Sequence, residues 1–93
     1  MSRIRYKYGM DETMARAMVN SYNHAIDNED RCSEWARNAD NEFDRRVYGR
    51  LALDYCKQAT EDLECLLHYG YDYVTIDDEG HIALKNEQMA LAV

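Results

Sequence analysis

The feature that most limits the fold is a long stretch without helix-breaking residues. Residues 11–69 contain no proline, and Gly49 is the only glycine among them. Apolar residues recur there every three or four positions, the spacing that places them along one face of a helix. Asp11 is a residue type that caps helix N-termini well. We therefore expect residues 11–69 to be almost entirely helical.

The stretch is too long for one helix. A helix of about forty residues would be ~60 Å long at 1.5 Å per residue, too long to pack on so small a domain. The polar segment "RNADNE" is the expected break, with Asp40 capping the second helix. The expected helices are therefore 11–37 and 41–69, and a further break near 27–30 would leave a short middle helix.

The helical period also predicts which residues are buried. On the first helix these are Met14, Ala15, Met18, Tyr22, Ala25 and Ile26. On the rest of the stretch they are Cys32, Ala36, Ala39, Phe43, Val47, Leu51, Tyr55, Ala59, Leu63 and Leu66.

The two ends of the chain have strand patterns. Residues 3–8, "RIRYKY", alternate strictly between basic and apolar side chains, as a half-buried strand does. Residues 71–85 place "DDEG" between two short apolar runs, which predicts a β-hairpin with Gly80 at a position of positive φ. Gly70 is placed to end the preceding helix in the left-handed conformation. Residues 86–93 are a short helix or a tail.

The assembled expectation is one α+β domain spanning residues 1–93. A small antiparallel sheet, made of the N-terminal strand and the C-terminal hairpin, would pack on two or three α-helices. The alternative is an all-helical pair that dimerises and carries the hairpin as an appendage.

Charge narrows the class of partner. The net charge is −7, and all 18 acidic residues follow residue 10, whereas Arg3, Arg5 and Lys7 precede it. The field of the acidic body opposes direct nucleic-acid binding and attracts a protein with a basic surface. No signal peptide or membrane span is apparent, so we expect a cytoplasmic protein with no membrane partner, in which the three cysteines are reduced thiols.

Patterns for metal binding and catalysis are incomplete. An EF-hand alignment on Gly80 uses Asp77 and Glu79 but places Thr75 and Asn86 at two essential ligand positions. Cys56, Cys65 and His68 match no usual zinc spacing. His24, His68 and His81 are scattered, and no serine or cysteine sits in a recognisable nucleophile motif. We therefore expect no metal, no cofactor and no enzymatic activity.

Two groups of residues are candidates for partner binding. Carboxylates one helical turn apart lie ~6 Å apart along the axis, a spacing comparable to that of phosphates along a nucleic-acid strand. Tyrosine supplies large contact area with one polar group and little entropy cost. The alternatives are an ordinary solvated helix face for the acids and a cover over the core for the tyrosines. The candidates are Asp30, Glu34, Asp40, Asp44, Tyr69, Tyr71, Tyr73, Asp77, Asp78 and Glu79.

In size and composition the chain resembles the small acidic inhibitors of phages and mobile elements, the anti-CRISPR and anti-restriction proteins. The features that carry the resemblance are the length of 93 residues, the runs "DNED", "DNEFD", "EDLE" and "DDE", and the tyrosine surplus. The resemblance implies a non-enzymatic protein that, if phage-encoded, acts in the host cytoplasm on a CRISPR effector or another nuclease, by blocking or mimicking nucleic acid. A pure nucleic-acid mimic would not carry basic residues on its binding face, and the chain departs from that pattern at Arg3, Arg5, Lys7, Arg45, Arg46 and Arg50.

Two other functions stay open at this point. The apolar helix stripe, with Trp35 and Phe43, would suit a small homo-oligomeric structural or regulatory protein. The tyrosines and His68 would suit a binder of small ligands or nucleotides.

Overall fold

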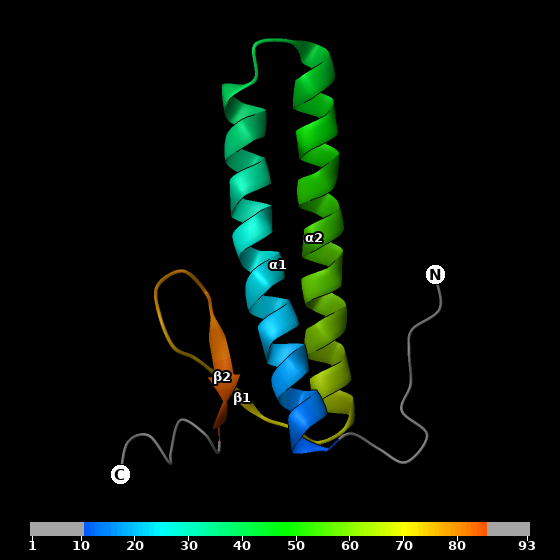
Figure 1. Ribbon diagram of the computed structural model, residues 1–93, viewed down its shortest axis with the longest axis vertical. Helices are drawn as coiled ribbons and strands as arrows, with labels where there is room; N and C mark the ends of the chain where they lie inside the picture. The colour runs from blue at the N-terminus through cyan, green and yellow to red at the C-terminus, as the bar shows by residue number, and fades with distance from the viewer. Residues whose placement is uncertain (1–10, 86–93) are drawn as a thin grey trace.

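The computed structural model describes residues 11–85, which form two long helices and one β-hairpin (Figure 1). The helices run antiparallel and side by side, and the two strands pair in an antiparallel sheet. The expected strand 3–8 and the tail 86–93 lie outside the described residues. The elements are α1 (Glu12–Asn38), α2 (Glu42–His68), β1 (Tyr73–Thr75) and β2 (Ile82–Leu84).

Helix α1 begins at the predicted cap and continues without interruption. The side chain of Asp11 accepts a hydrogen bond from the backbone N–H of Met14 at 2.8 Å. The alternative of a break near 27–30 is wrong. Asp27 and Asp30 are exposed there, while Ala25 and Cys32 on either side are buried. These polar residues thus face away from α2 and leave the contact between the helices intact.

The break between the helices lies at residues 39–41. Ala39 takes an extended conformation, and the residue that caps α2 is Asn41, not Asp40 as expected. Asn41 Oδ1 accepts from the backbone N–H of Asp44 at 2.8 Å, and Asn41 Nδ2 donates to the Asp44 carboxylate at 3.0 Å. The cap residue Asn41 and Asp44, the third residue of the helix, therefore stabilise each other at the start of α2.

Helix α2 ends in a Schellman motif around Gly70. Gly70 has φ of +82°, and its N–H donates to the carbonyl of Leu67 at 3.1 Å. The N–H of Tyr71 reaches back to the carbonyl of Leu66 at 3.0 Å. This confirms the left-handed glycine expected from the sequence, because a Cβ is disfavoured at such a φ.

The hairpin turns the chain back toward α1. Tyr73 pairs with Leu84 and Thr75 with Ile82, and Gly80 in the turn has φ of +91°, as expected. On the edge of β2 that does not face β1, the side chain of Asn23 on α1 bonds both main-chain polar groups of Ile82. It accepts from the N–H of Ile82 at 2.8 Å and donates to its carbonyl at 3.0 Å. Asn23 thus acts as a partner for the outer edge of β2.

The core lies at one end of the molecule. Its buried cluster is made where the first half of α1, the last half of α2 and strand β2 meet: Ala15, Val19, Leu66, Ile82 and Leu84. Farther along the helix pair, no residue from Ser33 to Gln58 is buried. Within residues 11–85, neither helix is apolar enough over a sufficient length to cross a bilayer.

The predicted core positions at the start of α2 are wrong. Phe43 is 73% exposed, Val47 40% and Leu51 39%. Their helical spacing is correct, but this face of α2 does not point at α1. With two helices side by side, each helix has only one neighbour to cover it.

Candidate functional site

The predicted acidic residues of α1 and of the loop after it are on the surface. Asp30, Glu34 and Asp40 are exposed. Within the described chain, none of the three takes part in an ion pair or a side-chain hydrogen bond. Asp30 and Glu34 lie one turn apart on α1, so their charges reinforce each other.

The fourth predicted acid has a local structural task. Asp44 is half-buried, and both its backbone N–H and its carboxylate are bonded to Asn41. A carboxylate in the first turn also complements the positive end of the helix dipole. Asp44 therefore helps to begin α2.

The tyrosines of the hairpin region cover the core. Tyr69, Tyr71 and Tyr73 are half-buried and pack against the buried cluster. Tyr73 lies on the same face of the sheet as Leu84, its cross-strand neighbour. The structure thus brings the three tyrosines together. Because their rings pack against the buried cluster, only part of each ring is open to a binding partner.

The acids of the turn divide into two kinds. Asp77 Oδ1 accepts from the backbone N–H groups of Glu79 and His81 at 3.0 and 3.1 Å. A carboxylate that binds main-chain N–H groups two and four residues on is a turn-forming group. Asp78 and Glu79 are exposed, and Asp78 has no polar side-chain partner within the described chain.

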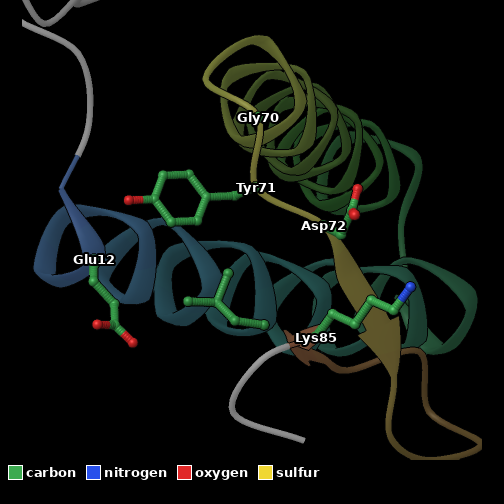
Figure 2. Close-up of a pocket in the computed structure, with 6 residues that line it drawn as sticks. Glu12, Gly70, Tyr71, Asp72 and Lys85 are labelled. Atoms are coloured by element: carbon green, nitrogen blue, oxygen red, sulfur yellow. The ribbon is translucent and has the colours of Figure 1, made fainter. Parts of the chain in front are cut away.

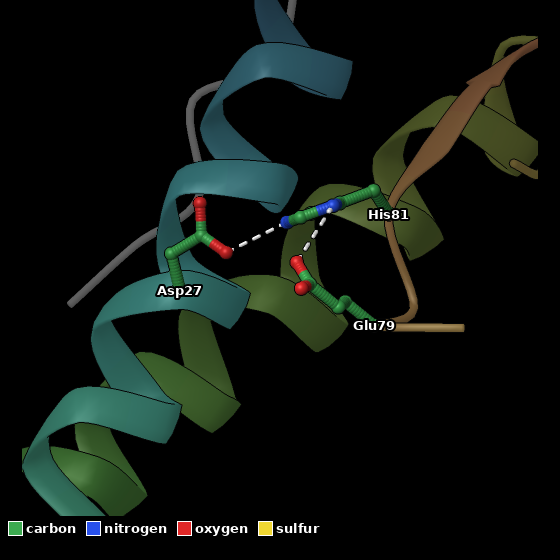
Figure 3. A group of neighbouring side chains, drawn as sticks. All are labelled: Asp27, Glu79 and His81. Atoms are coloured by element: carbon green, nitrogen blue, oxygen red, sulfur yellow. Dashed lines mark hydrogen bonds and ion pairs between the residues drawn. The ribbon is translucent and has the colours of Figure 1, made fainter. Parts of the chain in front are cut away.

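His81 joins the turn to α1. Its Nδ1 lies 2.7 Å from the Asp77 carboxylate. Its Nε2 lies 2.6 Å from the carboxylate of Asp27 on α1, a contact that Figure 3 shows. Hydrogen bonds to Asp27 and then to Asp77 raise the pKa of His81 from 6.5 to about 9. The hydrogen bond from His81 in turn lowers the pKa of Asp77. At neutral pH the ring is an imidazolium ion held between two carboxylates.

This cluster is not apparent from the sequence. His81 and Asp27 are 54 positions apart, and neither belongs to a recognisable motif. Asp27 is not among the candidate residues predicted above, whereas in the structure it holds the hairpin. Only the position of Asp77, four residues before His81, is a local signal.

The same cluster is the one place in the described chain where a metal ion is conceivable. One oxygen each of Asp27 and Glu79 and one ring nitrogen of His81 all lie within 4.8 Å of one another (Figure 3). However, Nε2 and the Asp27 oxygen are 2.6 Å apart, whereas two ligands of a tetrahedral zinc ion lie about 3.3 Å apart. Glu79 approaches the other ring nitrogen, at 3.7 Å. The geometry fits a shared proton rather than a metal ion.

A hollow of about 350 Å³ lies at the core end of the molecule (Figure 2). Charged groups of both signs line it, and the backbone N–H of Lys85 donates to the carbonyl of Asp72 at its edge. Among the described residues, its lining contains no histidine, serine or cysteine. The lining residues are Glu12, Gly70, Tyr71, Asp72, Leu84 and Lys85.

The opposite end of the helix pair carries exposed apolar side chains. Phe43, Val47 and Leu51 follow one another at intervals of four along α2, and with Arg46 and Arg50 they line an open depression of about 460 Å³. On α1, Trp35 is 48% exposed, and its ring lies 5.4 Å from that of Tyr48. We call Trp35, Phe43, Val47 and Leu51 the distal apolar surface.

Comparison of the chain with protein-family models, with curated proteins and with solved structures found no match.

Proposed function

We propose that this protein is a non-enzymatic inhibitor that binds a larger nucleic-acid-handling protein through an acidic surface and blocks its nucleic-acid site. The contact surface is the outer face of α1 and the loop that follows, formed by Asp30, Glu34 and Asp40. The observation that carries the proposal is that these exposed carboxylates have no ionic partner within the described chain.

Several other carboxylates have a basic partner. Glu42 pairs with Arg45 and Arg46 at 3.2 and 3.3 Å, and Asp54 pairs with Arg50 at 3.6 Å. Asp27 and Asp77 are bound to His81. Exposed acids without such a partner favour association with a basic surface.

The hairpin has a supporting part in this proposal. Tyr69, Tyr71 and Tyr73 hold it against the core, and Asp77 forms its turn. Asp78 and Glu79 remain exposed and add negative charge to the hairpin tip. We therefore assign the main contact to α1 and the loop, and a secondary contact to the tip.

The test begins with a pull-down from host lysate to identify a nucleic-acid-handling partner, followed by measurement of Kd with the purified partner. We expect Kd to rise by about tenfold or more between 150 and 500 mM salt, because the contact is between exposed charges. The variant Asp30→Lys/Glu34→Lys should raise Kd by about tenfold or more at low salt.

The matched control is Glu61→Lys/Asp72→Lys, which changes the net charge equally at exposed positions away from the proposed surface. We expect it to change Kd by no more than about threefold, through the long-range field alone. Equal losses in both double variants, or a Kd insensitive to salt, would contradict the assigned surface. A partner that still binds its oligonucleotide when saturated with the protein would contradict the blocking action.

A further inference from the structure

The distal half of the helix pair lacks a core of its own. No residue from Ser33 to Gln58 is buried, although Trp35, Phe43 and Leu53 in that stretch are large and apolar. Two-helix hairpins of natural sequence rarely hold together without a third layer, because each helix can cover only one face of the other. Within the described residues, the large apolar side chains of this end therefore have no layer that covers them.

We propose that the protein forms a two-fold symmetric homodimer through the distal apolar surface, with the α2 helices of the two copies packed antiparallel. The two hairpins then make a four-helix bundle at their distal ends. Bundles of this kind place apolar residues from all four helices in a shared interior. This inference is independent of the proposed inhibitory function.

The exposed area matches what a dimer requires. Trp35, Phe43, Val47 and Leu51 leave on the order of 400 Å² of apolar surface per copy in water. A specific interface buries about 800 Å² per partner, a little over half of it apolar. The alkyl parts of Arg46 and Arg50, which line the same depression, provide part of the polar rim.

Symmetry determines which side chains meet across this interface. When Val47 lies on the two-fold axis, antiparallel packing sets Phe43 against Leu51 of the second copy.

The oligomeric state of the full chain tests the proposal directly. Sedimentation velocity between 1 and 200 μM should show a monomer–dimer equilibrium. Val47→Glu should raise the dimer Kd by tenfold or more, because it places two carboxylates on the axis. Leu53→Glu is the matched control, since Leu53 is 60% exposed on the same helix but outside the depression lined by Phe43, Val47 and Leu51. It should leave the dimer Kd within threefold.

A cross-linking experiment guards against variants that fail to fold. In a Cys56→Ser background, which removes the exposed native thiol, Val47→Cys should give a disulfide-linked dimer on mild oxidation and Leu53→Cys should not. Circular dichroism checks that each variant keeps its helices.

Three outcomes would overturn the proposal. One is a wild-type chain that remains monomeric at 200 μM. Another is a dimer that Leu53→Glu weakens as much as Val47→Glu does, or that cross-links equally at both positions. The third is a monomer in which Val47→Glu abolishes binding of the inhibited partner, which assigns the distal apolar surface to that partner instead.

Discussion

At the scale of single residues, the most consequential side chain is the imidazole of His81. Both of its nitrogens bond to carboxylates, one from its own turn and one from α1. Its pKa rises from 6.5 to about 9, so folding and protonation of His81 favour each other. The stabilisation is fully present below pH 6.5 and is lost as the pH rises through about 9.

We therefore predict that Asp27→Asn lowers the pKa of His81 from about 9 toward 6.5, because the largest stabilising contact of the imidazolium is removed. NMR titration of the His81 ring protons measures the change directly. Asp30→Asn, one turn farther along α1 and without contact to His81, is the control and should leave the titration unchanged.

Asp27→Asn should also change how the free energy of unfolding depends on pH. Wild type should exceed Asp27→Asn in free energy of unfolding at pH 6, and the difference should shrink between pH 6.5 and 9 as the ring loses its proton. A difference that is constant or grows over this range would mean that Asp27 stabilises the fold in some other way.

Single residues also mark the limit of prediction from sequence. Asp11, Gly70 and Gly80 were placed correctly because caps and turns depend on neighbours within a few positions. The contacts of His81 with Asp27 and of Asn23 with Ile82 join residues 54 and 59 positions apart. Nothing local distinguishes these polar residues from the many other polar residues of α1.

At the scale of elements, the two helices and the hairpin were predictable, while what each face contacts was not. Periodicity shows that Phe43, Val47 and Leu51 share one face of α2. Whether that face is covered depends on how many other elements pack against α2. The spacing of apolar residues along the helix does not give that number. The choice of Asn41 over Asp40 as the cap likewise depends on a reciprocal bond with Asp44.

The hairpin is attached to α1 by Asn23, so its stability should depend on that side chain. We predict that Asn23→Ala lowers the free energy of unfolding by about 1–3 kcal/mol, because the N–H and the carbonyl of buried Ile82 lose their partner. Equilibrium unfolding in urea measures the loss, and hydrogen exchange at the Ile82 amide should accelerate.

The control for this variant is Asn20→Ala, one turn earlier on α1 at an exposed position. It should change the free energy of unfolding by less than about 0.5 kcal/mol. If Asn23→Ala is equally mild and the Ile82 amide stays protected, the side chain does not anchor β2.

At the scale of the whole molecule, the chain is thin. Its extents are 48 × 34 × 15 Å, and the shortest is little more than the diameter of one helix. The core is confined to the end where the hairpin meets both helices. In the single chain, the helices therefore share a buried core at one end and have none at the other.

This asymmetry predicts a gradient of hydrogen exchange along α1 and α2. At concentrations low enough for the chain to be monomeric, amides between Ser33 and Gln58 should exchange much faster than those around Val19 and Leu66. Raising the protein concentration should slow the fast group if the helices pair through the distal apolar surface. Uniform exchange along both helices of the monomer would show that the distal half is as stable as the core.

The confined core has a thermodynamic consequence as well. The heat capacity increment of unfolding comes from apolar surface newly exposed to water, and side chains already wet in the native state add little to it. For the single chain we expect an increment per residue below the usual ~12–15 cal/mol/K. The stability curve of the monomer is then unusually flat, so that cooling or warming by tens of degrees changes its folding free energy little.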